Sequence, residues 1–134
     1  MYAAGEDHPL RRPCVRVIED IRDGKIAATI SAEVVQEILH RFVAIRRPGL
    51  GAALARNALD LFSPVLAITH VVMDRMPGLI ERYPALAARD LVHVATCLEY
   101  GIAEIVSPDR GFDTVAELRR ITPESIEVWP RSGG

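Results

Sequence analysis

Apolar residues recur at helical spacing along much of this chain. The clearest case follows Ser31, where Val34, Val35, Ile38 and Phe42 fall on one side of a helix that Pro48 and Gly49 would end. The same spacing predicts helices over residues 12–23, 31–47, 52–62, 71–82 and 86–100, and a last short helix over residues 115–119. Pro77 should kink or break the helix over residues 71–82.

Short apolar runs between these helices predict strands. They cover residues 26–30, 65–68, 102–106 and 125–129. Strands that alternate with helices imply right-handed crossovers and a parallel sheet with helices on both faces. We therefore expect an α/β fold, a three-layer α/β/α domain with a central parallel sheet, formed as a single domain by residues 1–134.

Composition places the chain among ordinary globular proteins. It has 134 residues, of which 49% are hydrophobic and 25% charged. No apolar run reaches the length of a membrane span and no secretory leader opens the chain, so we expect a cytoplasmic protein without a membrane partner. Cys14 and Cys97 are far apart and form no C-x-x-C pattern, which argues against a disulfide framework or a zinc site.

The formal net charge of −2 excludes a strongly basic nucleic-acid binder. Nearly all basic residues are arginines, and three pairs of adjacent arginines occur, at Arg11–Arg12, Arg46–Arg47 and Arg119–Arg120. Arginine forks can grip phosphates bidentately. Any single pair is more simply explained as charged residues that solvate the end of a helix. A local basic rim beside an acidic centre is the alternative that the sequence leaves open.

Three acidic residues cluster near the end of the chain. Asp109 follows the predicted strand 102–106, and ligand sites of open α/β sheets lie beyond such strand ends. Asp113 is four residues further on, and Asp90 lies at the edge of the apolar stripe of its helix. Carboxylates brought together there would repel one another unless a cation is bound, and a hard divalent ion such as Mg²⁺ takes oxygen ligands.

Each acid also has a purely structural interpretation. Asp109 could cap a helix and Asp113 complement its dipole, while Asp90 could pair with Arg89 or Arg110. Capping does not account for Asp90, so we favour the functional interpretation of the cluster.

Glu37 and two histidines carry weaker signals. Helical geometry places Glu37 away from the apolar stripe, on a solvated side with Glu33 and Arg41. His93 follows Asp90 by one turn and His40 follows Glu37 by one turn, but neither pairs with another histidine at metal-ligand spacing. Either could shuttle a proton, and a packed structural role is the commoner one.

Three segments in order along the chain together resemble the PIN-domain family, with the VapC-type toxins as the closest match. They are Ser31-Ala-Glu-Val-Val-Gln-Glu-Ile-Leu-His-Arg41, Ala88-Arg-Asp-Leu-Val-His-Val-Ala95 and Ser107-Pro-Asp-Arg-Gly-Phe-Asp113. The resemblance implies an endoribonuclease that uses Mg²⁺ or Mn²⁺, cleaves RNA by metal-assisted phosphodiester hydrolysis and is neutralised by a cognate antitoxin. It implies metal-binding catalytic roles for Glu37, Asp90, Asp109 and Asp113, of which Asp113 matches an additional, more variable acid of the family. Ser107 matches a small polar residue beside the site.

One departure from the family concerns the first strand. Family members open with a central strand that carries an acidic residue, a few residues before a segment like Tyr2-Ala-Ala-Gly5, whereas this sequence starts at Met1. A start codon assigned too far downstream, a truncated form and a degenerate gene are the competing explanations. We favour the first, because the remaining motifs are intact. Without that strand we expect a gap in the middle of the sheet, one metal ligand fewer and exposed strand edges.

Two other functions remain open. A catalytically inactive PIN-fold remnant could still bind an antitoxin, and the apolar helices suit a homodimer in either case. A phosphoacceptor receiver domain also gathers acids at strand ends, but it needs a lysine late in the chain, and Lys25 is the only lysine.

Overall fold

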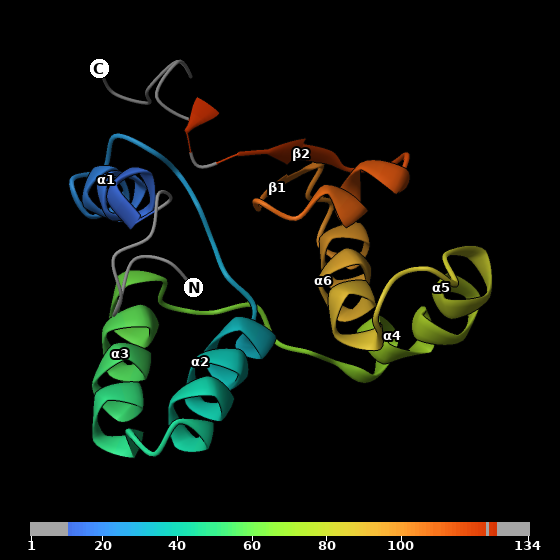
Figure 1. The fold of residues 1–134 in the computed structure, drawn as a ribbon. Coiled ribbons are helices and arrows are strands. Elements are labelled where there is room, and N and C mark those ends of the chain that lie inside the picture. Colours follow the sequence, from blue (N-terminus) through green and yellow to red (C-terminus); the bar gives the residue numbers. More distant parts are fainter. Residues whose placement is uncertain (1–10, 123, 126–134) are drawn as a thin grey trace.

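The computed structural model describes residues 11–122 and 124–125. Figure 1 shows its elements in two groups joined by the connecting segment 62–69, while the segment 23–31 links α1 to α2 within the first group. The N-terminal group consists of α1 (Arg11–Arg22), α2 (Ala32–Ala44) and α3 (Pro48–Leu61). The C-terminal group consists of α4 (His70–Asp74), α5 (Met76–Arg82), α6 (Ala88–Glu99), β1 (Glu104–Val106), the 3₁₀ helix η1 (Arg110–Thr114) and β2 (Arg119–Ile121).

The helices follow the apolar periodicity with two corrections. Pro48 follows the end of α2 and is also the first residue of α3. In the first turn of a helix the missing N–H of a proline costs nothing. The helix predicted over residues 71–82 is divided into α4 and α5, which meet at Arg75. Pro77 lies in the first turn of α5, so the break falls just before it.

The C-terminal group contains a short parallel ladder. In the register of β1 and β2, Ile105 lies opposite Arg120. The short helix predicted over residues 115–119 is wrong, since η1 comes earlier and β2 begins at residue 119. Val115 and Leu118 instead turn into the core, where both side chains are buried.

The strands predicted over residues 26–30 and 65–68 are wrong. The only pairing there in the described part of the chain is an isolated parallel bridge between Ser31 and Leu66. The Leu66 N–H donates to the Ile30 carbonyl at 2.9 Å, and the Ala32 N–H donates to the Leu66 carbonyl at 2.8 Å. The predicted strand 125–129 lies, apart from its first residue, outside the described residues. The fold is α/β with a parallel ladder, and the three expected layers are not established.

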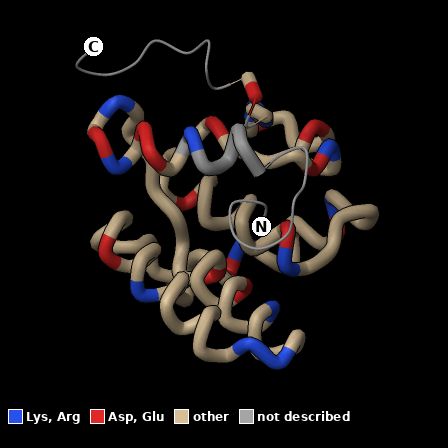
Figure 2. The backbone as a smooth tube through the Cα atoms, turned by 60° about the vertical axis from the view of Figure 1, so that its left-hand side comes forward, with Lys and Arg blue, Asp and Glu red and all other residues tan. Residues whose placement is uncertain are grey.

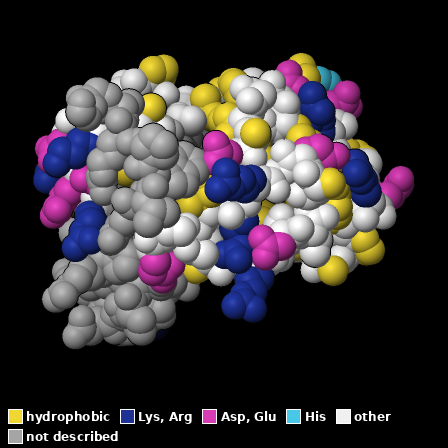
Figure 3. Space-filling view, turned by 90° about the horizontal axis from the view of Figure 1, so that it is seen from above, with side chains coloured by type: hydrophobic (Ala, Val, Ile, Leu, Met, Phe, Trp, Pro, Cys, Tyr) yellow, Lys and Arg dark blue, Asp and Glu magenta, His cyan; other side chains and the backbone are white. Residues whose placement is uncertain are grey.

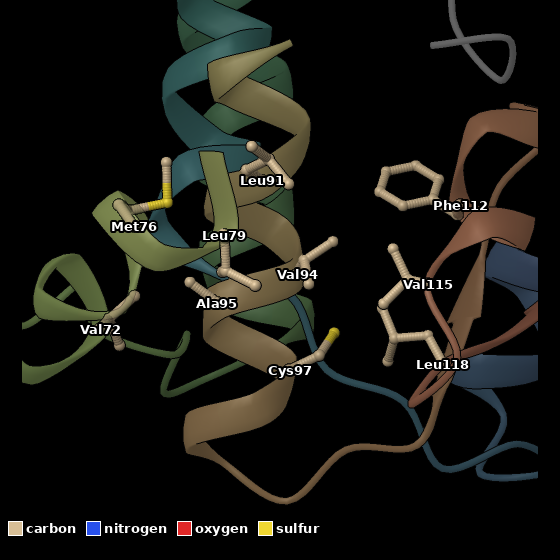
Figure 4. Close-up of a cluster of buried hydrophobic side chains, with 10 residues drawn as sticks. All are labelled: Val72, Met76, Leu79, Leu91, Val94, Ala95, Cys97, Phe112, Val115 and Leu118. Carbon is tan, nitrogen blue, oxygen red and sulfur yellow. The ribbon is translucent and has the colours of Figure 1, made fainter. Parts of the chain in front are cut away.

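The largest apolar core lies entirely in the C-terminal group (Figure 4). Figure 4 shows α6 at its centre, with side chains of α4 and α5 on one side and Phe112, Val115 and Leu118 on the other. The N-terminal group has its own contact between α2 and α3, where Phe42 is buried against Gly51. No helix in the described residues is both long and apolar enough to cross a membrane.

Candidate functional site

A cavity of about 880 Å³ lies between the two groups of elements. One wall is the connecting segment 26–31, and the opposite wall is residues 102–107, which include β1. Helix α6 contributes Asp90, His93, Thr96 and Cys97, and α2 contributes Val34 and Glu37. Asp109, Phe112 and Ile121 also line the cavity, together with Ile21, Phe62 and Leu66. The cavity thus separates the isolated Ser31–Leu66 bridge from the β1–β2 ladder.

Asp90 projects into this cavity from the first turn of α6 and is half-buried. Within the described residues it makes no hydrogen bond or ion pair, so the pairing with Arg89 or Arg110 that the structural alternative offered does not form. A half-buried carboxylate without a partner is available to bind a cation or a hydrogen-bond donor.

Asp109 combines the structural role with a place in the cavity wall. Its Oδ1 accepts a hydrogen bond from the Gly111 N–H at 2.8 Å, which caps η1 as the alternative interpretation expected. Its own N–H donates to the Ser107 Oγ at 3.1 Å. The first bond holds the carboxylate and the second holds the backbone of the turn, and the second carboxylate oxygen has no partner among the described residues.

Asp113 does not line the cavity. It pairs with Arg120, whose Nε donates to Oδ1 at 2.9 Å and whose Nη2 donates to Oδ2 at 3.3 Å. This hydrogen-bonded guanidinium lowers the pKa of Asp113 below its usual value. Asp109 and Asp113 thus do not act as a pair of carboxylates facing the same point.

Arg120 is the residue that sequence reasoning missed. Its Nη1 also donates to the Ser107 carbonyl at 3.1 Å, and its side chain is only 13% exposed. One guanidinium therefore ties both ends of the turn 107–113 to β2. The adjacent arginines at 119 and 120 were a signal, but only the strand register shows which of them turns inward.

The Glu37 side chain is 39% exposed, so it is in part solvated as expected, and it also contacts α6. Its Oε1 lies 3.0 Å from the Nε2 of His93, and the His93 side chain is 16% exposed. His93 follows Asp90 by one turn of α6, so the two side chains share a face of that helix. The Glu37–His93 contact connects the N-terminal group to the C-terminal group beside the acidic wall.

The donor set suits a hard divalent cation, but the site is not closed. Glu37, Asp90 and Asp109 all line the cavity, and the lining residues that the structure describes include no Lys or Arg that would neutralise them. No group of three Asp, Glu, His or Cys residues in the described part of the chain lies close enough to hold a single ion. The chemistry of the ligands fits, and their spacing leaves the site incomplete.

Surface charge is mixed on the faces of the described residues that the figures show. Figures 2 and 3 show Lys and Arg interspersed with Asp and Glu over the faces in view. Arg119 approaches Glu104 at 4.0 Å and Arg120 binds Asp113, so the third arginine pair neutralises neighbouring acids. The distinctive feature of the molecule is therefore the acidic cavity.

Comparison with known proteins gives a consistent picture. The profile of the PIN domain matches residues 1–118. Ribonuclease VapC13 of Mycobacterium tuberculosis is 32% identical over 121 residues, which cover 90% of this chain and 92% of that protein. Ribonuclease VapC7 of the same species is 35% identical over 129 residues, covering 93% and 87%. Ribonuclease VapC23 is 39% identical over 111 residues, covering 81% and 86%.

No solved structure gives a significant match. The family assignment therefore rests on sequence, and the sequence matches extend over most of the chain and of each relative. The segments that carry Glu37, Asp90 and Asp109 all lie within the matched range. This chain belongs to the PIN-domain family, among its VapC-type members.

Proposed function

We propose that this chain is a toxin of the VapC type, a metal-dependent endoribonuclease that cleaves RNA in the cytoplasm. The observation that carries the proposal is the placement of Glu37, Asp90 and Asp109, from three separate parts of the chain, on the wall of one cavity. Among the described lining residues there is no Lys or Arg. Membership of the PIN-domain family and the ribonuclease names of the relatives support it.

Glu37, Asp90 and Asp109 would hold Mg²⁺ or Mn²⁺. When bound, such an ion supplies a water activated for attack and stabilises charge on the phosphate. The surrounding residues position these ligands: His93 orients Glu37, the Gly111 N–H and Ser107 orient Asp109, and Asp90 stays unpaired.

Asp113 takes a positioning role in this proposal. Its pair with Arg120 holds the guanidinium against the Ser107 carbonyl and so fixes the turn from which Asp109 projects. A direct part for Asp113 in metal binding, which the family resemblance implied, would require this pair to open first.

Cleavage of a labelled structured RNA with and without Mg²⁺ tests the proposal. Asp90→Asn and Asp109→Asn should each lower cleavage by about a hundredfold or more, because each removes a charged oxygen ligand. Asp60→Asn is the matched control, since Asp60 is exposed on α3 and outside the cavity lining. Full activity in either Asp90→Asn or Asp109→Asn would remove the site assignment.

We also propose a cognate antitoxin and a second copy of the chain as protein partners. Exposed apolar side chains on and beside α2 and α3 support such contacts, namely Leu39, Val43, Ile45 and Leu59. Sedimentation analysis over a range of concentrations tests the homodimer, and a monomer at every concentration would exclude it. Relief of growth arrest by a co-expressed antitoxin tests the other contact.

A second candidate is a catalytically inactive module that binds an antitoxin. The incomplete spacing of the acids favours it. The same RNA assay, run beside a version extended upstream to the next in-frame start, separates the two. Cleavage by this chain supports the enzyme, cleavage only by the extended form assigns the missing part of the site to the added segment, and no cleavage by either supports the binding module.

A further inference from the structure

The turn between α2 and α3 lies in a stretch of one-sided charge. Residues 38–59 contain four arginines and no Asp or Glu, although the whole chain has a formal net charge of −2. Arg41 lies in the last turn of α2, and Arg46 and Arg47 belong to the turn that joins α2 to α3. Figure 2 shows this turn as a blue segment at the lower end of the tube, with no red beside it. The turn is therefore a local exception to the mixed charge of the surface.

Arg46 occupies a backbone position that favours glycine. Its φ is 61°, in the left-handed region. The Arg46 N–H donates to the Val43 carbonyl at 3.0 Å, and the Arg47 N–H donates to the Phe42 carbonyl at 2.7 Å. These two bonds form the Schellman motif at the end of α2, in which glycine usually takes the position of Arg46. A residue with a Cβ is strained in this conformation, so the geometry of the turn does not select arginine.

Arg47 is also a poor match to its local position. It is the N-cap residue of α3, and its side chain makes no capping bond. Arginine offers no acceptor to the free N–H groups at the start of a helix, and its charge meets the positive end of the helix dipole. Ser, Thr, Asp or Asn would stabilise this position more. Two consecutive arginines thus occupy positions for which the backbone favours other residues.

The side chains of the three arginines are exposed and unpaired. Arg41, Arg46 and Arg47 make no side-chain hydrogen bond or ion pair within the described residues. By contrast, Arg75 and Arg120 each bind an acid of the same chain at 2.9 Å. Positive charges that the local structure does not require, and that no described acid neutralises, are available to an anionic partner.

Arg41 connects this turn to the acidic cavity. It follows Glu37 by four residues, so both side chains lie on one face of α2. Glu37 contacts His93 and makes no ion pair with Arg41. From Glu37 to the end of α2 at Ala44 the helix rises by about 10 Å, at roughly 1.5 Å per residue. That distance corresponds to about three phosphates of a nucleic-acid strand at roughly 3.4 Å each.

We propose that Arg41, Arg46 and Arg47 form an anchoring site for the phosphate backbone of single-stranded RNA, an extension that rests on the proposed ribonuclease function. Guanidinium groups bind phosphate oxygens through paired N–H donors, and such contacts position a strand without reading its bases. At the far end of α2 these charges would hold RNA without neutralising the acids of the cavity. RNA fits better than an acidic protein segment because its negative charges repeat at short, regular intervals along the strand.

Fluorescence anisotropy tests the anchor without catalysis. The probe is a labelled single-stranded oligouridylate of about twelve nucleotides, titrated with the full chain in EDTA so that Mg²⁺ is absent. Arg46→Ala together with Arg47→Ala should weaken binding by about tenfold at about 0.1 M salt. The slope of log affinity against log salt should fall by about 1.4, since each lost phosphate contact lowers it by about 0.7. Arg56→Ala, at an exposed position on α3, is the matched control and should change binding by less than about twofold.

Arg46→Gly separates the RNA contact from folding. Glycine relieves the left-handed φ, so the melting temperature should rise by about 3 °C. RNA binding should fall by about threefold, whereas Arg46→Lys keeps the charge and should bind within about twofold of the native chain. A lower melting temperature in Arg46→Gly would mean that Arg46 serves the fold. Unchanged RNA binding by Arg46→Gly and by the double variant would overturn the anchor.

Failure of the anchor and failure of the nuclease give different results. If the native chain cleaves RNA in Mg²⁺ and the double variant binds oligouridylate equally well, the anchor is wrong and the nuclease stands. If the double variant binds more weakly but the native chain never cleaves, the RNA contact stands and the nuclease is wrong. Loss of antitoxin binding in the double variant, with unchanged RNA affinity, would assign the arginines to a protein partner and contradict the anchor.

Discussion

The two groups of elements are held together by different means. In the C-terminal group, α4, α5, α6 and the segment from η1 to β2 share one buried apolar cluster, and two strands form a ladder. In the N-terminal group, α2 and α3 pack closely around Phe42, and the segment 26–31 makes one isolated bridge. The difference shows that an apolar run becomes a strand only where a neighbouring strand is available.

The two walls of the cavity illustrate this at close range. Residues 26–30 and 102–106 have similar apolar patterns, and both predict strands. Residues 104–106 form β1 because β2 lies beside them, whereas residues 26–30 stay extended without a ladder. Backbone pairing is a property of two segments, so the pattern of one segment cannot guarantee it.

The largest effect should come from the core of the C-terminal group. Leu91→Ala removes a fully buried side chain from the centre of the cluster and should lower the free energy of unfolding by about 3–4 kcal/mol. Urea unfolding measures it. Leu59→Ala, at a side chain that is 43% exposed, should change stability by less than about 0.5 kcal/mol. Equal losses in both variants would mean that the cluster is not the main source of stability.

A smaller loss of stability should come from the contact between α2 and α3 in the N-terminal group. A Cβ at Gly51 would lie 2.7 Å from the Cβ of Phe42, so Gly51→Ala must push α2 and α3 apart at a cost of about 2 kcal/mol. Gly49→Ala in the same helix meets no atom within 4 Å and should be stabilising by about 0.5–1 kcal/mol. Thermal unfolding of both variants gives the comparison. Stabilisation by Gly51→Ala would refute the close packing of α2 against α3.

The contact between the two groups should affect metal binding more than folding. His93→Ala leaves Glu37 without its partner and should weaken Mn²⁺ binding, measured by calorimetry, by about tenfold. The Mg²⁺ concentration for half-maximal RNA cleavage should rise in parallel. His40→Ala, at an exposed position on α2, is the control and should change neither. Unchanged Mn²⁺ affinity in His93→Ala would show that the contact does not serve the acidic wall.

The smallest effect should be a change in how the melting temperature depends on pH in acid. Arg120 lowers the pKa of Asp113 from its ordinary value of 3.8, so the pair stabilises the fold above about pH 4 and this contribution is lost as the pH falls through the lowered pKa. The gap in melting temperature between the native chain and Asp113→Asn should therefore be present at pH 7 and shrink below about pH 4. A gap that widens in acid would have the wrong sign. Asp74→Asn, at an exposed position on α4, is the control and should show no such pH-dependent gap.

The candidate site was only partly predictable from the chain. Asp90 and Asp109 stood out because one edges an apolar stripe and the other follows an apolar run, and both line the cavity. Glu37 looked solvated by helical geometry, since that geometry says nothing about a second helix approaching from residues 88–99. The structural use of Asp113 depends on Arg120, which only the register of β1 and β2 brings into reach.

The sequence by itself determined the family, the positions of most helices and the segments that carry the acids. These depend on local spacing and on motifs that can be read along one chain. Only the tertiary structure decided which apolar runs pair, which way the Glu37, Asp113 and Arg120 side chains are held, and that Glu37, Asp90 and Asp109 line one cavity. Pairing, burial and ion contacts join residues distant in sequence, so they are fixed by packing in three dimensions.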